Sequence, residues 1–385
     1  MRGFDRPTTD TFLADLAETL GPFRPSLPPP PVDPATQPIV WIVGTPRSGT
    51  TLLAELLTAS TDIGFVDNLA ARFPEHPETG MLLSASLRPA TGAAGGVGRG
   101  VVTGAGTGVV TGAGTGAEAE PGAVTGTAAP RAAFPPFDIG RTQGPHGTHE
   151  FGFFWSRWLG LRPDAAHRLD GPARVAVDRN GLRTQLHRMI AVAGGPFLVR
   201  NVICGLNAAL LAEVHPASVF VELQRDPAAT AASILTCRRR RGGGARHWWS
   251  LRPSTWRPDR LAPSSDAAAA AECARQVLDI RRDLADERAA VERAAGSAGG
   301  SAAGSAGGSA GGPSTTSARW RTVQYADLCT DPAAVVGEIV ADVVALGGKL
   351  DHRPPPMAPE PARAAPQLPD EEAQAIVDEL SADDR

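Results

Sequence analysis

Several residue types are scarce in this sequence. Its 385 residues include one tyrosine, one lysine and four cysteines. The cysteines form no Cys-x-x-Cys pair and no metal-ligand spacing, which argues against a disulfide framework and a zinc site. A reduced, intracellular protein is therefore expected. Because 36 of the 37 basic residues are arginine, a cluster of arginines is by itself weak support for a binding site.

Long apolar runs are also missing. No run approaches the ~20 residues of a transmembrane helix. The N-terminus, MRGFDRPTTD, lacks the basic-then-apolar pattern of a signal peptide. The formal net charge of −4 does not suggest binding to nucleic acid. We therefore predict a cytoplasmic protein with no membrane span and no nucleic-acid partner.

Two stretches are too rich in glycine to bury a core. Residues 89–131 are mostly Gly, Ala, Thr and Val, with VVTGAGTG twice in tandem, and residues 296–318 are largely Gly, Ser and Ala. Glycine loses much entropy on ordering and offers no side chain to pack, so both stretches are interpreted as flexible insertions. The predicted domains are an N-terminal arm (1–37, with a short helix at 9–20), one folded domain (38–350) and an acidic C-terminal tail (351–385).

Strand and helix patterns alternate through the folded domain. Apolar runs predict strands at 39–43, 62–66, 196–200, 218–223 and 319–325. Helices are predicted at 50–59, 179–193, 205–214, 267–295 and 332–346, with a further helix from Pro227 capped by Asp226. This alternation predicts an α/β three-layer sandwich with a mostly parallel central sheet. Ligands of such sheets bind at the carboxyl ends of the strands.

The first strand runs into a glycine loop and then a helix, in PIVWIVGTPRSGTTLLAELL. Gly44 and Gly49 have the spacing of a phosphate-binding P-loop, but Thr50 stands where an NTP-binding loop needs Lys. Arg47 is the only cation inside the loop, and a guanidinium forks onto phosphate or sulfate oxygens. The loop therefore suits a short anion better than a magnesium triphosphate, although a tight turn without a ligand has the same pattern.

A second motif, VELQRDPAATAASIL, follows a later strand. It places Arg225 at the end of the strand and Ser233 two turns into the next helix. A cation and a hydroxyl beside a helix N-terminus form an anion site. The alternative is an arginine that caps a carbonyl and a serine that packs on a helix face.

Together the two motifs resemble those of sulfotransferases that use 3′-phosphoadenosine 5′-phosphosulfate (PAPS). GTPRSGTTLL is similar to the 5′-phosphosulfate loop of that family, and Arg-Asp-Pro with a serine eight residues after the arginine is similar to its 3′-phosphate motif. Tyr325 begins a Tyr-x-x-Leu element found late in many members. The resemblance extends over residues 38–346 and implies a P-loop-like sulfotransferase fold.

The resemblance also implies the chemistry and the binding residues. The enzyme would transfer a sulfuryl group from PAPS, as co-substrate and without a metal, to a hydroxyl or amine of a small-molecule, lipid or glycan acceptor. Arg47 and Arg200 would be the cations near the leaving group. The residues expected to bind the co-substrate are Thr45, Arg47, Ser48, Gly49, Thr50, Thr51, Arg225, Ser233 and Tyr325.

The sequence departs from the family at the catalytic base. Val202 stands where cytosolic members carry a histidine after Lys-Thr, and Arg200-Asn201 is similar to the Lys-Asn of many bacterial members. The candidates for the base are Asp67, near the position of a catalytic glutamate in some members, and His149 with Glu150, in a segment similar to a bacterial HEFGYFW.

Three further interpretations stay open. Trp155 and Trp158 either shape an apolar acceptor pocket or pack in the core. Residues 238–241 form a solvated basic loop, or else Arg238 supports the 3′-phosphate and the rest forms a lid. Two other functions also remain: a P-loop nucleotide-dependent kinase, which the missing lysine disfavours, and a non-catalytic relative that binds PAPS or its product, which Val202 keeps open.

Overall fold

The computed structural model describes residues 30–87, 142, 144–241, 243–301, 317–355 and 366–383. The helix expected at 9–20, the first glycine-rich insertion and most of the second lie outside these residues. None of the described helices is both long enough and apolar enough to cross a membrane.

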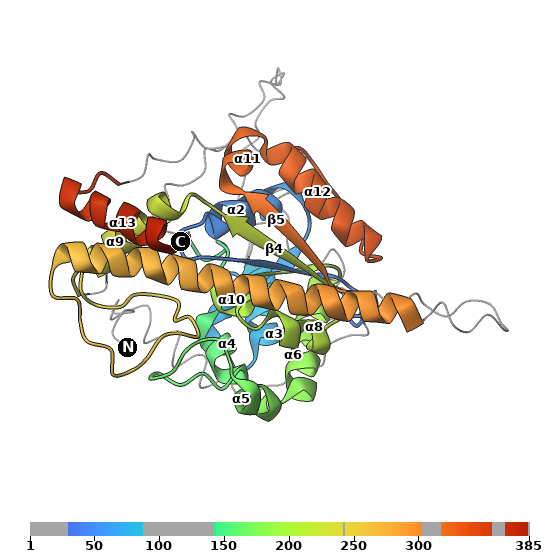
Figure 1. Ribbon diagram of the computed structural model, residues 1–385. Coiled ribbons are helices and arrows are strands. Elements are labelled where there is room, and N and C mark those ends of the chain that lie inside the picture. Colours follow the sequence, from blue (N-terminus) through green and yellow to red (C-terminus); the bar gives the residue numbers. More distant parts are fainter. Residues whose placement is uncertain are drawn as a thin grey trace, which may run out of the picture.

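Within the described residues the sheet has five strands, all parallel, in the order β2-β3-β1-β4-β5 (Figure 1). Trp41 in the central strand lies opposite Val199 on one neighbour and Phe220 on the other. The predicted α/β architecture is confirmed, and the sheet is wholly rather than mostly parallel. The strands are β1 (Ile39–Gly44), β2 (Gly64–Phe65), β3 (Phe197–Arg200), β4 (Ser218–Gln224) and β5 (Arg319–Gln324).

Apolar side chains cover both faces of the sheet, because consecutive strand residues point to opposite faces. Ile39, Trp41 and Val43 pack on one side, and Val40 and Ile42 on the other. The second face is covered by α2 (Thr50–Ser60), α11 (Tyr325–Thr330) and α12 (Pro332–Ala345). The first is covered mainly by α3 (Pro77–Leu87), α4 (Gly152–Trp158), α6 (Arg179–Ala193) and α8 (Ala208–Val214).

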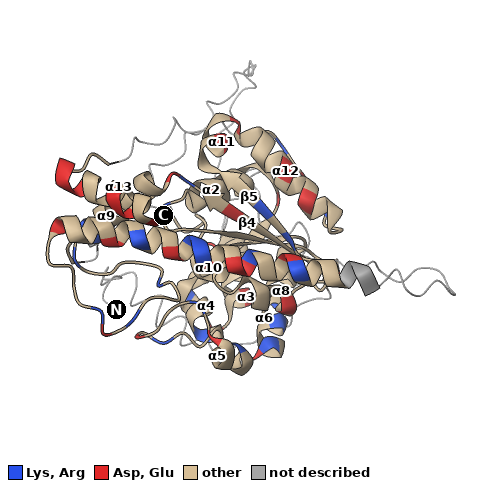
Figure 2. Cartoon of the chain, viewed as in Figure 1, with Lys and Arg blue, Asp and Glu red and all other residues tan. Residues whose placement is uncertain are grey.

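The longest helix, α10 (Asp266–Ser301), runs across the first face and packs on α9 (Pro227–Arg241) and α13 (Asp370–Asp383). Acidic and basic residues are interspersed along it (Figure 2). Its last six residues, Gly296–Ser301, were predicted to belong to a flexible insertion. That prediction is wrong for them, because adding a residue to an existing helix forms one hydrogen bond and costs far less than starting a new helix.

One other boundary differs from prediction. The helix expected at 205–214 begins later, as α8 (Ala208–Val214), and a short helix that was not predicted, α7 (Val202–Gly205), precedes it. Asn201 begins α7, because its side chain accepts a hydrogen bond from the Ile203 amide. Asn207 separates the pair, and its amide group binds the chain at His167 and Leu169. Buried asparagines thus set where α7 begins and where the chain breaks between α7 and α8.

The end of the predicted acidic tail forms a helix, α13, that packs on the folded domain. In α13, Ile376 is 2% exposed and joins an apolar cluster with α9 and α10. Glu372 is also buried and forms an ion pair with Arg239 of α9. The acidic composition of this segment gave no sign of the packing, because one buried apolar residue and one ion-paired residue are enough to attach a short helix. The remaining elements are α5 (Gly171–Ala176) and the short 3-10 helix Ala70–Arg72.

Candidate functional site

The predicted site residues lie at the carboxyl ends of the parallel strands. Thr45 follows β1, Arg200 ends β3, Arg225 follows β4 and Tyr325 follows β5, while Asp67 comes two residues after β2. Parallel strands end at one edge of a sheet, so the five residues share that edge. The strand order separates them into two sides: Asp67 and Arg200 beyond one flank of β1, Arg225 and Tyr325 beyond the other.

The loop between β1 and α2 has an unusual backbone. Gly44, Arg47 and Gly49 all have positive φ, at 142°, 73° and 108°. Glycine adopts such values without strain, whereas Arg47 does so at a cost. The Ser48 hydroxyl is buried and has no hydrogen-bond partner in the described part of the chain. The loop is therefore strained at one residue and holds an unsatisfied hydroxyl, two features that accompany ligand-binding loops.

Four of the predicted residues, Arg47, Arg225, Ser233 and Tyr325, come together beside this loop; we call them the Arg225 group. The Arg47 Nε donates to the Ser233 Oγ at 3.0 Å, and the Arg225 Nη1 donates to the Arg47 carbonyl at 3.2 Å. The Arg225 guanidinium also stacks 4.9 Å from the centre of the Tyr325 ring. The Arg47 side chain thus reaches the 3′-phosphate motif, and not only the 5′ position expected from its place in the loop.

Tyr325 closes one side of the loop. A Cβ added to Gly49 would lie 2.5 Å from the Tyr325 ring, so only glycine fits there. Burial raises the pKa of Tyr325 to about 12, the neighbouring Cys329 acts in the same direction, and Arg225 and Arg47 oppose both. The tyrosine is therefore neutral at physiological pH and presents a ring face to the Arg225 cation.

On the other flank of β1, Arg200 is the centre of a second group with Thr51, Glu150 and Thr148. Arg200 Nη1 donates to Thr51 Oγ1 at 2.8 Å and to Glu150 Oε1 at 3.2 Å, while Nη2 donates to the Thr148 carbonyl at 3.1 Å. The Arg200 side chain is only 4% exposed, against 52% for Glu150. Burial lowers the pKa of Arg200, and the Glu150 and Glu55 carboxylates oppose that shift.

The Nε of Arg200 has no hydrogen-bond partner among the described residues. A buried cation whose main acidic partner is half exposed is incompletely compensated. Arg200 and Arg225 follow strands that lie on either side of β1. The two groups therefore lie on opposite flanks of the central strand, at the same edge of the sheet.

Asp67 lies near Arg200, but its carboxylate is buried and already hydrogen-bonded. It is 1% exposed. Its Oδ1 accepts from the Ala70 amide at 2.8 Å, and its Oδ2 faces the Ser84 hydroxyl and, at 3.1 Å, His146 Nδ1. Asp67 also pairs with Thr148 in an antiparallel bridge, which links it to the Arg200 group. Sequence reasoning missed Ser84 and His146, because neither has a recognisable spacing from Asp67.

The remaining candidates are placed as follows. His149 accepts the Phe151 amide at Nδ1, 2.8 Å away. Trp155 is 1% exposed and packs edge-on against Trp41 at 5.5 Å, so it belongs to the core and not to a pocket wall. Trp158 is partly buried against the same core.

The arginines at 238–241 do not form a loop, because α9 continues through Arg241. Arg238 is fully buried, pairs with Glu272 at 2.5 Å and donates to Gln276 at 2.9 Å. Its guanidinium lies 5.1 Å from the Trp248 ring. The solvated-loop interpretation is therefore wrong for residues 238–241. Arg238 ties α9 to α10, and its support of the 3′-phosphate stays a prediction.

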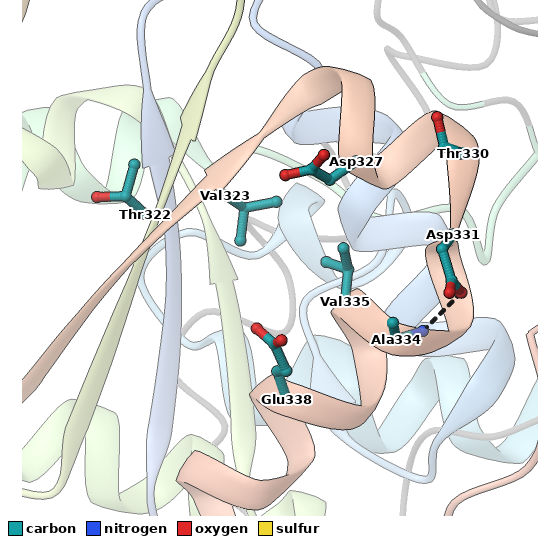
Figure 3. Close-up of a pocket in the computed structure, with 8 residues that line it drawn as sticks. All are labelled: Thr322, Val323, Asp327, Thr330, Asp331, Ala334, Val335 and Glu338. Atoms are coloured by element: carbon teal, nitrogen blue, oxygen red, sulfur yellow. Dashed lines mark hydrogen bonds between the residues drawn. The ribbon is translucent and has the colours of Figure 1, made fainter.

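A hollow of about 300 Å³ lies beside the edge strand β5, under α11 and α12 (Figure 3). Three carboxylates line it: Asp327, Asp331 and Glu338. Asp331 caps α12 by accepting from the Ala334 amide at 2.9 Å. An acidic lining repels phosphate and sulfate, so this hollow is unsuited to the anion that the loop and its arginines would bind.

No protein-family model and no curated protein matches this sequence. Solved structures that resemble the chain include those of two mycobacterial sulfotransferases. STF1 of Mycobacterium tuberculosis H37Rv is 13% identical with a TM-score of 0.39, over 95% of this chain and 75% of that one. STF9 of Mycobacterium avium is 14% identical with a TM-score of 0.40, over 97% and 72%. At this identity and overlap the likeness carries no functional conclusion, which must come from the site itself.

Proposed function

We propose that this chain is a PAPS-dependent sulfotransferase. The observation that carries the proposal is the Arg225 group: two arginines, a buried serine and the only tyrosine converge beside a P-loop-like turn that lacks lysine. Neither Arg47 nor Arg225 forms an ion pair with a carboxylate in the described residues. Two neighbouring guanidinium groups without an acidic partner repel each other, and a doubly charged phosphate removes that repulsion.

In this proposal the Arg225 group binds the 3′-phosphate. Arg225 and Arg47 would supply charged donors, and the Ser233 hydroxyl a further one near the beginning of α9. Tyr325 holds the Arg225 guanidinium in place by stacking. Few other nucleotides carry a phosphate at this second position, so this subsite would distinguish PAPS from ATP.

The loop and the Arg200 group would bind the 5′-phosphosulfate. The amides at the start of α2, with the Thr50 and Thr51 hydroxyls, would donate hydrogen bonds to the phosphate, as at other helix N-termini. Arg200 already donates to Thr51 and keeps its Nε unsatisfied. An anion there would accept the hydrogen bond that the buried Arg200 leaves unmade. Arg200 would also stabilise the charge that develops on the departing phosphate.

This arrangement fixes the direction of the co-substrate. The 3′-phosphate would lie over β4 and β5, and the sulfuryl group would lie toward β3 and β2, where Arg200 and Asp67 are found. The acceptor, a small molecule, lipid or glycan, would approach from that side. Its hydroxyl or amine attacks sulfur, the bond from sulfur to the phosphate oxygen breaks, and adenosine 3′,5′-bisphosphate leaves.

The proposal is tested with sulfur-labelled PAPS and a cell extract as the source of acceptors. We expect label in a new product that depends on the protein. Arg225→Ala removes a charged hydrogen bond of about 1.5–3 kcal/mol. The affinity for the bisphosphate should therefore fall roughly 10- to 150-fold. The matched control is Arg288→Ala, an exposed arginine of α10.

Adenosine 5′-phosphosulfate, which lacks the 3′-phosphate, separates binding from structure. Its affinity should be nearly the same for the parent and Arg225→Ala. Equal weakening of both ligands would show that Arg225 only supports the loop. Tight bisphosphate binding without any labelled product would favour the non-catalytic alternative.

A further inference from the structure

Three polar side chains form a buried cluster beside the Arg200 group. Asp67 follows β2, Ser84 belongs to α3, and His146 precedes the strand-like residue Thr148. Ser84 Oγ donates to Asp67 Oδ2 and lies 3.0 Å from His146 Nδ1, which is itself 3.1 Å from the same carboxylate oxygen. Three segments far apart in the sequence thus meet at one imidazole nitrogen.

These contacts fix the tautomer of His146. An ionised carboxylate only accepts hydrogen bonds, so the Nδ1 that faces Asp67 must carry the proton. The Ser84 hydroxyl donates its hydrogen to Asp67, so its oxygen accepts a hydrogen bond from the same Nδ1–H. In the neutral imidazole the proton is then on Nδ1 and the free lone pair is on Nε2, on the far side of the ring from Asp67.

Solvent exposure decides which member of the cluster an acceptor substrate can reach. The Asp67 side chain is 2% exposed and the His146 side chain 30%. Asp67 also receives the Ala70 amide, so both of its oxygens are engaged. His146 is therefore the accessible end of the pair, and Asp67 holds it in place.

The cluster adjoins the side of the site where the sulfuryl group is proposed to lie. Asp67 pairs with Thr148, whose carbonyl accepts from Arg200, which in turn donates to Thr51 at the start of α2. His146 is two residues from Thr148. Thr148 thus connects the cluster of Asp67 and His146 to Arg200, the cation proposed to lie at the leaving group.

We propose that His146 is the catalytic base and that Asp67 is its positioning residue. This inference rests on the proposed sulfotransferase function. As the acceptor oxygen attacks sulfur, its proton passes to His146 Nε2, a bond forms between that oxygen and sulfur, and the bond from sulfur to the phosphate oxygen breaks. The electron pair leaves with the bisphosphate, and Asp67 stabilises the imidazolium that results.

The two other candidate bases fit this role less well. The Oε1 of Glu150 already accepts a hydrogen bond from Arg200 Nη1 at 3.2 Å, so this carboxylate is engaged in an ion pair. His149 uses Nδ1 to accept the Phe151 amide. Its neutral form must therefore carry the proton on Nε2, the opposite tautomer from His146.

Nuclear magnetic resonance of the full chain with isotope-labelled histidine tests the tautomers without any acceptor. His146→Gln and His149→Gln assign the two signals. We expect the proton on Nδ1 for His146 and on Nε2 for His149. In Asp67→Asn, whose amide can donate to Nδ1, the His146 proton should move to Nε2. A parent protein with His146 protonated on Nε2 would overturn the inference.

Turnover of labelled PAPS gives the second readout. His146→Ala should lower transfer by ~10²–10⁴, leave bisphosphate affinity nearly unchanged, and regain part of its rate with added imidazole. His247→Gln, in an exposed loop, is the control. If His146→Ala turns over like the parent, the assignment is wrong while the sulfotransferase proposal stands. If the parent does not bind the bisphosphate, it is the proposed function that fails.

Discussion

At the scale of single residues, the site is defined by cations whose charge or hydrogen bonding the protein satisfies only in part. Arg47 and Arg225 meet around one serine, and Arg200 is buried with one nitrogen unsatisfied. Arg200 and the buried Arg238 of α9 each pair with a carboxylate and keep an unsatisfied Nε. Arg47 and Arg225, by contrast, have no ion pair within the described residues. An unpaired cation costs free energy in the empty protein, and that cost becomes binding free energy when an anion arrives.

Some of these residue-level features could be predicted and others could not. The spacing of Arg225 and Ser233 after a strand predicted that both would lie at the sheet edge. The direction of the Arg47 side chain and the partners of Asp67 depend on contacts between segments distant in sequence. Ser84 and His146 were missed for that reason, since no local pattern links them.

Tyr325 offers a prediction about pH. Its pKa is raised to about 12 from an ordinary 10.0, mainly by burial. Because it is the only tyrosine, the near-ultraviolet absorbance of tyrosinate reports this residue alone. The folded protein should show almost no tyrosinate at pH 10, whereas the protein in urea should be about half ionised there.

The direction in which this raised pKa changes stability with pH follows from the protons bound by the folded and the unfolded chain. Below pH 10 both states hold the proton, and the contribution of Tyr325 is fully present. Between pH 10 and 12 the unfolded chain loses the proton first, so the free energy of unfolding falls as pH rises. A native protein that is half ionised at pH 10 would show that Tyr325 is not buried against the loop.

At the scale of elements, the long helix α10 connects the site to the C-terminus. It packs on α9, whose first turns carry Ser233, and α13 packs on both. The sequence predicted these helices but not their packing, because α13 is acidic and only one side of it is apolar. Helix packing depends on which faces meet, and periodicity alone does not reveal the partner.

The role of α13 is tested by Ile376→Ala. Ile376 is 2% exposed within the cluster of α9 and α10, so the change should lower the free energy of unfolding by about 2–4 kcal/mol. Val377, the next residue, is 48% exposed, and Val377→Ala should change it by less than about 0.5 kcal/mol. Urea denaturation measures both. Equal effects would mean that α13 does not pack as described.

At the scale of the whole molecule, the strand order gives the site its two sides. The sequence predicted the class of fold because strands and helices alternate and the first strand is continuously apolar. It could not predict the order β2-β3-β1-β4-β5, which sets Arg200 and Arg225 on opposite flanks of the loop. Two cationic groups on either side of one loop are what a ligand with two well-separated anionic groups requires.

The central claim is that the molecule recognises a nucleotide with a 3′-phosphate, and a calorimetric titration tests it most directly. Adenosine 3′,5′-bisphosphate and ATP with magnesium are titrated into the same protein. The 3′-phosphate adds charged hydrogen bonds worth about 1.5–3 kcal/mol, so the bisphosphate should bind roughly 10- to 150-fold more tightly than ATP. ATP that binds as tightly as the bisphosphate, or more tightly, would contradict the account.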